Sequence, residues 1–381
     1  MMSRRASIPA LTLLATTLGG CGETPPQGPP PLSETALAAI GERPGAPRRA
    51  VARAVDDVFT NPELGETRAV VLLHEGSVVA ERYAEGYDAE TRFVSWSMAK
   101  TVTAMLIGLL VSDGLLRLDE PAPVARWQRP GDPRSAITLR HLLQMRSGLE
   151  HTEAGPDPAT SSEVQMLFLA GRDDMARWAE EQPLEAEPGE QFEYSSNTTV
   201  ILADIAARAL TDSPDPDIRR RAVLGYLQTR LFEPLGITSL VPEFDARGTM
   251  IGGSLMHATA RDWARLGDLL RTRGSYRGSQ ILPRRWVVQM TEPSPAAPQY
   301  GFQTWLNRPL DDEAGDSEHP LFPTRAPDSV FAMIGHMGQY ALMSPDQRVT
   351  LVRLGHSDAP QRAILLNEMA NVLALYPGSE N

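Results

Sequence analysis

The chain contains a single cysteine among its 381 residues, so no disulfide can form within it. It also lacks a cluster of lysine and arginine residues, and its net charge at pH 7 is −12. Proteins that bind nucleic acid attract the phosphate backbone through such clusters, so we expect no nucleic acid partner. No His-Glu-x-x-His pattern and no glycine-rich nucleotide loop occur, and the seven histidines are scattered. The sequence therefore predicts neither a metal nor another cofactor.

A short apolar stretch lies close to the amino terminus. Arg4 and Arg5 precede the run 8–18, which is apolar apart from one proline and three threonines. A helix of that length cannot cross a hydrocarbon layer of about 30 Å. We therefore expect a signal peptide over residues 1–21 rather than a membrane-spanning anchor.

Cys21 directly follows Leu18, Gly19 and Gly20, and this order is similar to the lipobox of bacterial lipoproteins. The resemblance implies that Cys21 is acylated and becomes the new amino terminus, with the lipid holding the protein at a membrane. We therefore expect an exported lipoprotein of the periplasm or the cell envelope. The alternative is an ordinary signal peptide in which the cysteine is incidental, and the paired arginines leave the export route open.

The rest of the chain is expected to form a short tether and one folded domain, 36–381. Residues 22–35 contain five prolines and predict an extended linker. Helices are expected at 50–59 and at about 360–375, and the middle of the chain is mainly helical. Strands are expected at 69–73 and 78–83, which form a hairpin, and at 301–306, 331–334, 340–344 and 349–354. Strands near both ends favour a sheet lobe, about 36–96 and 246–381, with an inserted helical lobe, about 97–245.

The most informative segment is 93–112, in which Lys100 is the only ionisable side chain. Ser97 and Lys100 are three residues apart, so they share one face of a helix. Ala104 and Gly108 continue that face, and their small size permits close packing against another element. Burial of Lys100 would lower its pKa, and a neutral amine can accept the proton of Ser97 and make it a nucleophile. The beginning of the helix adds backbone N–H groups that suit a developing oxyanion.

Two structural alternatives compete with this interpretation. A transmembrane helix over 93–112 would carry a central lysine, which costs roughly 2.5–3.5 kcal/mol on insertion scales. A core helix whose lysine reaches solvent is the other alternative. Because Ser-x-x-Lys alone occurs often by chance, the hypothesis depends on the uncharged helix around it.

Several motifs together resemble one family of enzymes. Residues 95–100, SWSMAK, and the helix after them resemble the nucleophile helix of the class C β-lactamase-like serine hydrolases. Further similar segments are 113–116 (DGLL), 137–143 (ITLRHLL), 147–149 (SGL), 252–254 (GGS), 259–265 (TARDWAR), 281–282 (IL) and Trp286. The likeness covers about 67–355, and it is greatest to the branch that contains the 6-aminohexanoate-dimer hydrolases. It implies an α/β (α+β) fold of the penicillin-recognising type, with an antiparallel sheet flanked by helices and an inserted helical lobe. Within these segments we interpret His141, Arg261 and Asp262 as structural residues.

The resemblance implies a second catalytic element. Family members place Tyr-x-Asn or Ser-x-Asn opposite the nucleophile, and this chain has Tyr194, Ser195, Ser196 and Asn197. Asn197 comes one residue late when counted from Tyr194, whereas Ser195 and Asn197 fit Ser-x-Asn. Residues 188–193, which read PGEQFE, match the class C-like branch, so we take Tyr194 as the general acid/base and Asn197 as a contact to the lysine or the substrate. Ser195 is the reserve candidate for the hydroxyl, and a tyrosine that only packs at a helix start is the structural alternative.

The third implied element is Gly335-His336-Met337-Gly338-Gln339, which is similar to the Gly-x-x-Gly-Gln strand of the aminohexanoate-hydrolase branch. It implies that the N–H of His336 is the second oxyanion donor, and that the glycines, including Gly338, let a substrate carbonyl approach the backbone. The alternatives are a side-chain role for His336, like that of the lysine in the Lys-Thr-Gly strand of many relatives, and an incidental surface histidine. Without that lysine, strong β-lactamase activity is not the first expectation.

These residues predict a serine hydrolase that forms an acyl-enzyme on Ser97 while Lys100 and Tyr194 move protons. Small amides or esters are the expected substrates. One alternative is a D-Ala-D-Ala carboxypeptidase or β-lactamase that acts on cell-wall peptides or penicillins. The other is a catalytically silent lipoprotein that binds peptidoglycan or a partner.

Overall fold

The computed structural model describes residues 31–154, 157–309 and 321–378. The predicted signal peptide with Cys21, and most of the predicted linker, lie outside the described residues. Helix α1 (Glu34–Ala38) begins within the last two residues assigned to that linker. The hydroxyl of Ser33 caps it by accepting a hydrogen bond from the N–H of Ala36 at 3.0 Å.

The secondary structure follows the predicted order. The strands are β1 (Glu66–His74), β2 (Ser77–Tyr83), β3 (Arg92–Val94), β4 (Val241–Pro242), β5 (Met256–Thr259), β6 (Ser275–Tyr276), β7 (Ser279–Gln280), β8 (Trp305–Leu306), β9 (Phe331–Gly335), β10 (Gln339–Ser344) and β11 (Val349–His356). The helices after α1 are α2 (Arg48–Thr60), α3 (Met98–Ser112), α4 (Leu139–Leu143), α5 (Ser162–Phe168), α6 (Met175–Glu180), α7 (Ser196–Leu210), α8 (Pro216–Leu227), α9 (Glu233–Leu235), α10 (Ala260–Arg271), α11 (Arg284–Met290) and α12 (Ala359–Ala374). The predicted hairpin, the last three strands and the terminal helix are confirmed, with boundaries that differ by at most three residues. The strand expected at 301–306 is shorter, because only its last two residues pair as β8.

The main sheet is antiparallel and joins both ends of the described chain. Six strands lie in the order β2-β1-β11-β10-β9-β8, and β1 pairs with β11 so that Leu72 lies opposite Leu351. The turn between β1 and β2 uses Glu75 and Gly76, both with positive φ, which matches the twist of two tightly joined strands. The predicted sheet built from distant parts of the sequence is therefore confirmed.

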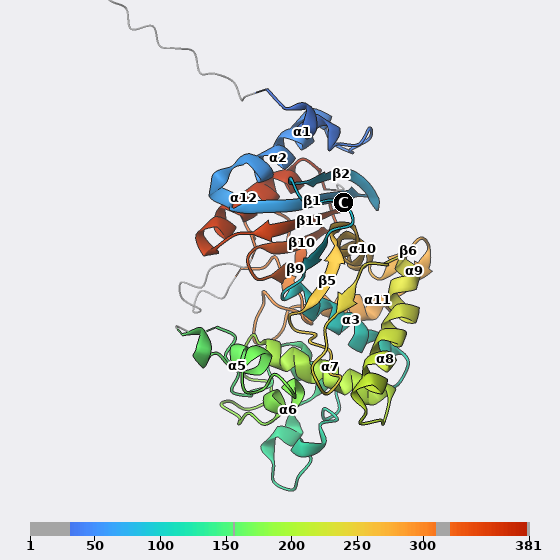
Figure 1. The fold of residues 1–381 in the computed structure, drawn as a ribbon, viewed down its shortest axis with the longest axis vertical. Helices are drawn as coiled ribbons and strands as arrows, with labels where there is room; N and C mark the ends of the chain where they lie inside the picture. The colour runs from blue at the N-terminus through green and yellow to red at the C-terminus, as the bar shows by residue number, and fades with distance from the viewer. Residues whose placement is uncertain (1–30, 155–156, 310–320, 379–381) are drawn as a thin grey trace, which may run out of the picture.

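Successive side chains of β1 enter two different cores. Val70 and Leu72 pack with α2 and α12, whereas Val71 and Leu73 pack with the cluster that contains α3 and α10. In Figure 1, α1, α2 and α12 lie at one end of the molecule and α5, α6, α7 and α8 at the other. The sheet, α3 and α10 lie between them, so α3 is placed where the two halves meet.

Helix α3 is a core helix. Every residue from Met98 to Leu110 is buried. Gly108 lies against Trp286 of α11, whose indole N–H donates a hydrogen bond to the backbone oxygen of Ala104 at 3.0 Å. A Cβ at position 108 would lie 2.3 Å from the indole nitrogen, so the predicted close packing at the small residues is confirmed. No helix among the described residues is long and apolar enough to span a membrane.

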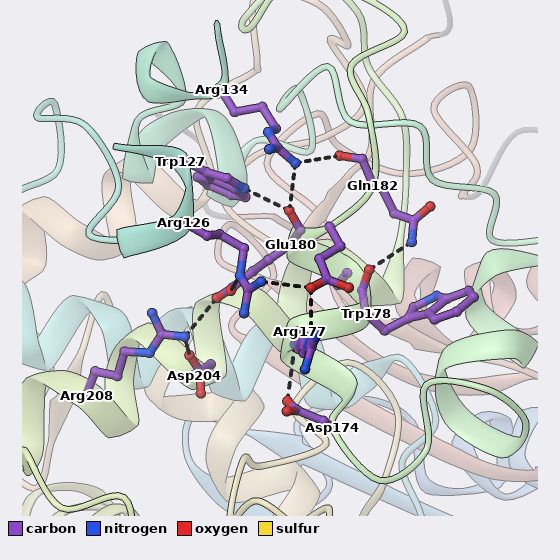
Figure 2. A network of polar contacts seen from close by, with 12 residues as sticks. Arg126, Trp127, Arg134, Asp174, Arg177, Trp178, Glu180, Gln182, Asp204 and Arg208 are labelled. Carbon is purple, nitrogen blue, oxygen red and sulfur yellow. Dashed lines mark hydrogen bonds and ion pairs between the residues drawn. The ribbon is translucent and has the colours of Figure 1, made fainter. Parts of the chain in front are cut away.

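A network of ion pairs and hydrogen bonds around the buried Glu180 joins segments of the helical half (Figure 2). The carboxylate of Glu180, at the end of α6, accepts from Arg126 at 2.6 Å and from Arg208 of α7 at 3.1 Å. Arg208 also pairs with Asp204 at 2.5 Å, and the indole N–H of Trp127 donates to the backbone oxygen of Glu180 at 2.9 Å. These contacts hold the loop before α4 and the helices α6 and α7 in one fixed arrangement.

Three residues of the family-like segments have the structural roles expected of them. His141 completes a capping box with Thr138 at the start of α4. Arg261 pairs with Glu81 of β2 at 2.6 Å, and Asp262 accepts hydrogen bonds from the loop before β4. None of the three contacts the cavity described below.

Candidate active site

The nucleophile candidate lies on a tight turn between β3 and α3. The N–H of Ser95 donates to the backbone oxygen of Met256 in β5 at 2.7 Å, which fixes the start of the turn. Trp96 then adopts a φ of 44°, a value that a bulky side chain rarely takes. Ser97 follows as the N-cap of α3, half-buried, and lines a cavity of about 500 Å³. A cavity of that volume suits a small-molecule ligand.

Lys100 lies one turn further along α3 and is surrounded by oxygen atoms. Its side chain is 1% exposed. The amine Nζ lies 3.0 Å from the hydroxyl of Ser97, 2.7 Å from the hydroxyl of Ser196 and 3.0 Å from the backbone oxygen of Gly253. A carboxylate oxygen of Glu153 lies 3.2 Å away. These acceptors can use all three hydrogens of an ammonium group.

The surroundings of Lys100 keep it protonated. Burial lowers the pKa of Lys100, but the carboxylate of Glu153, together with Tyr194 and Glu163, outweighs burial and raises that pKa above its ordinary value. The predicted lowering of the lysine pKa is therefore wrong. The sequence revealed the apolar helix around the lysine, whereas the carboxylates come from a separate segment of the chain.

Tyr194 lies just before α7 and completes a group of three side chains. Its hydroxyl interacts with the hydroxyl of Ser97 and with the amine of Lys100, and that amine lies 4.6 Å from the centre of the Tyr194 ring. Tyr300 and Trp305 pack against the same ring. Burial raises the pKa of Tyr194 although Lys100 opposes the shift, so the phenol is neutral at rest. The structure thus brings together Ser97, Lys100 and Tyr194, as the sequence predicted.

The residues after Tyr194 differ from the expectation. Ser195 is buried and caps α7 by accepting from the N–H of Asn197 at 3.1 Å, so it is not a second catalytic hydroxyl. Asn197 is also buried, and its amide lies 3.4 Å from the backbone oxygen of Ser162. The predicted contact of Asn197 with the lysine or substrate is therefore wrong, since one residue turns about 100° around a helix. Ser196, two residues after Tyr194 as in Tyr-x-Asn, contacts the lysine instead.

The third element lines the cavity beside the nucleophile turn. His336 is in the turn after β9 and lines the cavity next to Gly335. Its ring lies 5.5 Å from the ring of Trp96. A Cβ at position 335 would lie 2.2 Å from the backbone oxygen of Ser95, so only glycine lets β9 approach the nucleophile turn this closely. Burial and then Arg362 lower the pKa of His336, so its imidazole is neutral at pH 7.

Gly338 does not have the role expected of it. Its φ of 81° allows the turn between β9 and β10, and its carbonyl accepts a hydrogen bond from Arg353 at 2.9 Å. It is buried and does not line the cavity. The predicted substrate contact of Gly338 is therefore wrong, and Gly335 is the glycine that shapes the site.

The comparison with known proteins gives the family. A sequence model described as Beta-lactamase matches residues 66–374. The chain belongs to the beta-lactamase family. It is 26% identical over 276 residues to the 6-aminohexanoate-dimer hydrolase of Paenarthrobacter ureafaciens. That match covers 66% of this chain and 65% of the relative, slightly less than two thirds of the relative's length.

Solved structures show the same fold. A 6-aminohexanoate-dimer hydrolase candidate from Bacillus anthracis superposes with a TM-score of 0.64 at 21% identity, covering 85% of this chain and 83% of its own. A class C beta-lactamase from Rhodobacter sphaeroides gives a TM-score of 0.58 at 18% identity, covering 86% and 99%. The chain thus has the β-lactamase and penicillin-binding-protein fold that its motifs predicted, and it is related to 6-aminohexanoate-dimer hydrolase.

Two carboxylates of this beta-lactamase-family site were not found from the sequence. Glu153 lies in the loop before α5, and Glu163 lies in the first turn of α5. Both line the cavity, next to apolar side chains that include Val164 and Leu167. They approach Lys100 from more than fifty residues away in the sequence, and no spacing pattern marks such a contact.

Proposed function

We propose that the chain cleaves small amide or ester substrates through an acyl-enzyme on Ser97. The main support for this proposal is that a serine hydroxyl, a lysine amine and a tyrosine hydroxyl lie together at a cavity of about 500 Å³. The relative named for the 6-aminohexanoate dimer supports a small substrate. The apolar walls of the cavity suit the aliphatic part of such a molecule.

In the proposed reaction, the oxygen of Ser97 attacks the substrate carbonyl and its proton passes to Lys100. The carbonyl oxygen becomes an oxyanion, which the backbone N–H groups of Ser97 and His336 stabilise. Tyr194 gives a proton to the departing amine or alcohol as the C–N or C–O bond breaks, and is reprotonated through Lys100. Water then hydrolyses the ester on Ser97 and restores the free enzyme.

A substrate panel tests this proposal. The panel contains p-nitrophenyl esters, linear amide dimers and nitrocefin, and the matched control is Ser97→Ala. We expect turnover of an ester or an amide dimer, with a loss of at least about 10³-fold in the variant, because removal of the nucleophile leaves only binding and the oxyanion donors. No turnover of any panel member, together with no fluorophosphonate adduct on Ser97, would identify a catalytically silent binding protein.

One observation favours a second candidate, a D-Ala-D-Ala carboxypeptidase or β-lactamase. Arg362 of α12 lines the cavity close to His336, and its side chain has no ion pair among the described residues. A guanidinium binds carboxylates well, and penicillins and cell-wall peptides both carry one. A fluorescent penicillin that acylates Ser97 rapidly and stably, and does so more slowly in Arg362→Gln, would favour this candidate. Absence of labelling would exclude it.

We also propose that the protein is an exported lipoprotein held at a membrane through Cys21. Its support is the order of residues 18–21 and the apolar run before them. The lipid-bearing residue would precede the described domain by a proline-rich tether, so the cavity would face the aqueous compartment.

A further inference from the structure

The ammonium of Lys100 cannot accept the proton of Ser97 until it has given up one of its own. Of its oxygen neighbours, the backbone oxygen of Gly253 cannot pass a proton on. Glu153 is the nearer carboxylate, and Ser196 is the hydroxyl in closest contact, at 2.7 Å. A hydroxyl can accept one proton while donating its own, so Ser196 can relay a proton onward.

Ser196 contacts both carboxylates of the site. Its hydroxyl oxygen lies 2.8 Å from Glu153 and 2.9 Å from Glu163. The hydroxyl carries one hydrogen, so it can donate to only one of the two carboxylates at a time. When Lys100 donates to Ser196, the Ser196 hydroxyl donates to one of the two carboxylates. The other carboxylate must then accept a hydrogen bond from a different donor or carry a proton itself.

The two carboxylates differ in how well their charge is stabilised. Glu153 accepts from the backbone N–H of Ser196 at 2.5 Å and lies 3.2 Å from the amine of Lys100. Among the described residues, the hydrogen-bond partners of Glu163 are two hydroxyls, those of Ser196 at 2.9 Å and Ser254 at 3.4 Å. Glu153 is therefore the fixed anion, and Glu163 is the place where an extra proton can be held.

We propose that Glu163 receives, through the hydroxyl of Ser196, the proton that Lys100 gives up before Ser97 attacks. One N–H bond of Lys100 breaks and its electron pair stays on nitrogen. Ser196 gains that proton and passes its own to Glu163, so an ammonium and a carboxylate become an amine and a carboxylic acid. The amine then takes the proton of Ser97. This inference rests on the proposed function, and Glu163 and Ser196 act in it as positioning residues through Lys100.

The relay requires Glu163 to be ionised before each turnover. Burial and then the nearby Glu153 raise the pKa of Glu163 to about 7, against the opposing effect of Lys100. Activation of Ser97 should therefore increase as pH rises through about 7.

Other titratable groups near the site must be separated from Glu163. Glu193, next to Tyr194, also has its pKa raised to about 7, by burial and by Glu185 and Glu153. His336 and Arg362 line the cavity together with Glu163. Glu193→Gln is thus the matched control for Glu163→Gln, because Glu193 has a similar pKa and does not bond to Ser196.

The rate at which a fluorophosphonate labels Ser97, measured from about pH 5 to about pH 9, tests the relay. Fluoride leaves without needing a proton, so this rate reports the activation of the nucleophile alone. We expect Glu163→Gln to label about 10- to 100-fold more slowly and to lose the rise near neutral pH. Glu193→Gln should keep the wild-type labelling rate and the rise of that rate near neutral pH. Ser196→Ala should resemble Glu163→Gln, and the double variant should be no slower than the slower single variant, because the two residues act in series.

Lys100 is the only lysine in the chain, so protein labelled with ¹³Cε-lysine gives a single lysine side-chain signal. We expect that signal to shift near pH 7 as Glu163 ionises, and the shift should be absent in Glu163→Gln and present in Glu193→Gln. The inference is overturned if Glu163→Gln labels at the wild-type rate with the wild-type pH profile, or if Glu193→Gln alone abolishes the rise. No labelling of the wild type at any pH would instead overturn the proposed function itself.

Discussion

At the scale of single residues, the distribution of lysine is unusual. The chain has 36 lysines and arginines together, and Lys100 is the only lysine among them. Arginine is not deprotonated in proteins and pairs well at surfaces and in buried networks. Lysine can lose its proton, which is what a base beside a nucleophile has to do. The position of Lys100 beside Ser97 therefore fits a chemical role better than a packing role.

Replacing Lys100 by methionine keeps most of the unbranched side chain and removes the charged amine. We expect a loss of about 10²- to 10⁴-fold in ester turnover, because Ser97 loses its proton acceptor. The free energy of unfolding should fall by roughly 2 kcal/mol at about pH 8, because Glu153 and Glu163 then face each other without the cation.

The stability loss in Lys100→Met should depend on pH. Lys100 now lowers the pKa of Glu163, so its removal raises that pKa further. A carboxyl with a raised folded-state pKa contributes stability at low pH that is lost as pH rises through that pKa. The variant should therefore be destabilised less at about pH 5 than at about pH 8 in thermal or urea unfolding. Equal destabilisation at both values would show that the carboxylates do not depend on Lys100.

The positions of the proposed catalytic residues were predictable to the extent that short spacing fixes their geometry. Ser97 and Lys100 share one face of their helix wherever that helix packs in the fold. Tyr194 follows residues 188–193, a segment that resembles the family's sequence. Glu153 and Glu163 come from an irregular loop and a short helix whose place is set by the tertiary fold. The direction of the lysine pKa depends on them, so it could not be predicted from the apolar helix alone.

At the scale of elements, the loop that carries Glu153 is fixed by a buried histidine. His151 is 3% exposed; its Nδ1 lies 3.1 Å from the hydroxyl of Thr198 in α7 and its Nε2 lies 3.2 Å from the backbone oxygen of Ala179 in α6. The carbonyl can only accept, so Nε2 carries the hydrogen and Nδ1 accepts from the threonine. Burial lowers the pKa of His151 to about 4, so the ring stays neutral.

This histidine should make the fold sensitive to acid. Its pKa is about 4 when folded and about 6.5 when unfolded, so the unfolded state binds more protons between those values. The free energy of unfolding should therefore decrease as pH falls from about 6.5 towards 4, by roughly 3 kcal/mol from this residue. Urea unfolding at a series of pH values measures the effect.

Glutamine at position 151 cannot titrate, so His151→Gln should weaken the pH dependence while lowering stability at pH 7. The exposed His356 offers a matched control, since His356→Gln should leave the dependence unchanged. If His151→Gln were as acid-sensitive as the wild type, another group would have to explain the effect.

The position at which α7 begins explains why the prediction for Asn197 was wrong. The approach segment before Tyr194 was recognisable, but the residue at which α7 begins was not. Because α7 begins at Ser196, a shift of one residue decides whether Ser196 or Asn197 meets the lysine.

At the scale of the whole molecule, apolar runs near both ends of the chain predicted a sheet built from both ends, and the family resemblance implied that this sheet is antiparallel. Both faces of β1 are buried against the two cores, and β11 from the other end of the chain pairs with one of its edges. The strand expected at 301–306 is mostly a turn instead. There Gln303 has a φ of 51°, and its buried amide donates to the backbone oxygens of Leu142 and Leu143.

The proposed attachment to a membrane depends on Cys21, which lies outside the described residues. We expect Cys21→Ser to move the protein from the membrane fraction to the soluble fraction, because the acyl chains that bury in the bilayer are lost. Ultracentrifugation of cell extracts with and without detergent measures this. Ester turnover per mole should stay the same in both forms, and a wild-type protein that is soluble without detergent would contradict the lipid anchor.

The central claim is that Ser97 forms a covalent bond with the substrate's acyl group. Quenching the enzyme with acid during turnover of a p-nitrophenyl ester, followed by mass spectrometry of the intact protein and its peptides, tests this most directly. The account predicts a mass increase of one acyl group on the peptide that contains Ser97, absent in Ser97→Ala and nearly absent in Lys100→Met. Turnover without any acylated peptide, or acylation at another residue, would contradict it.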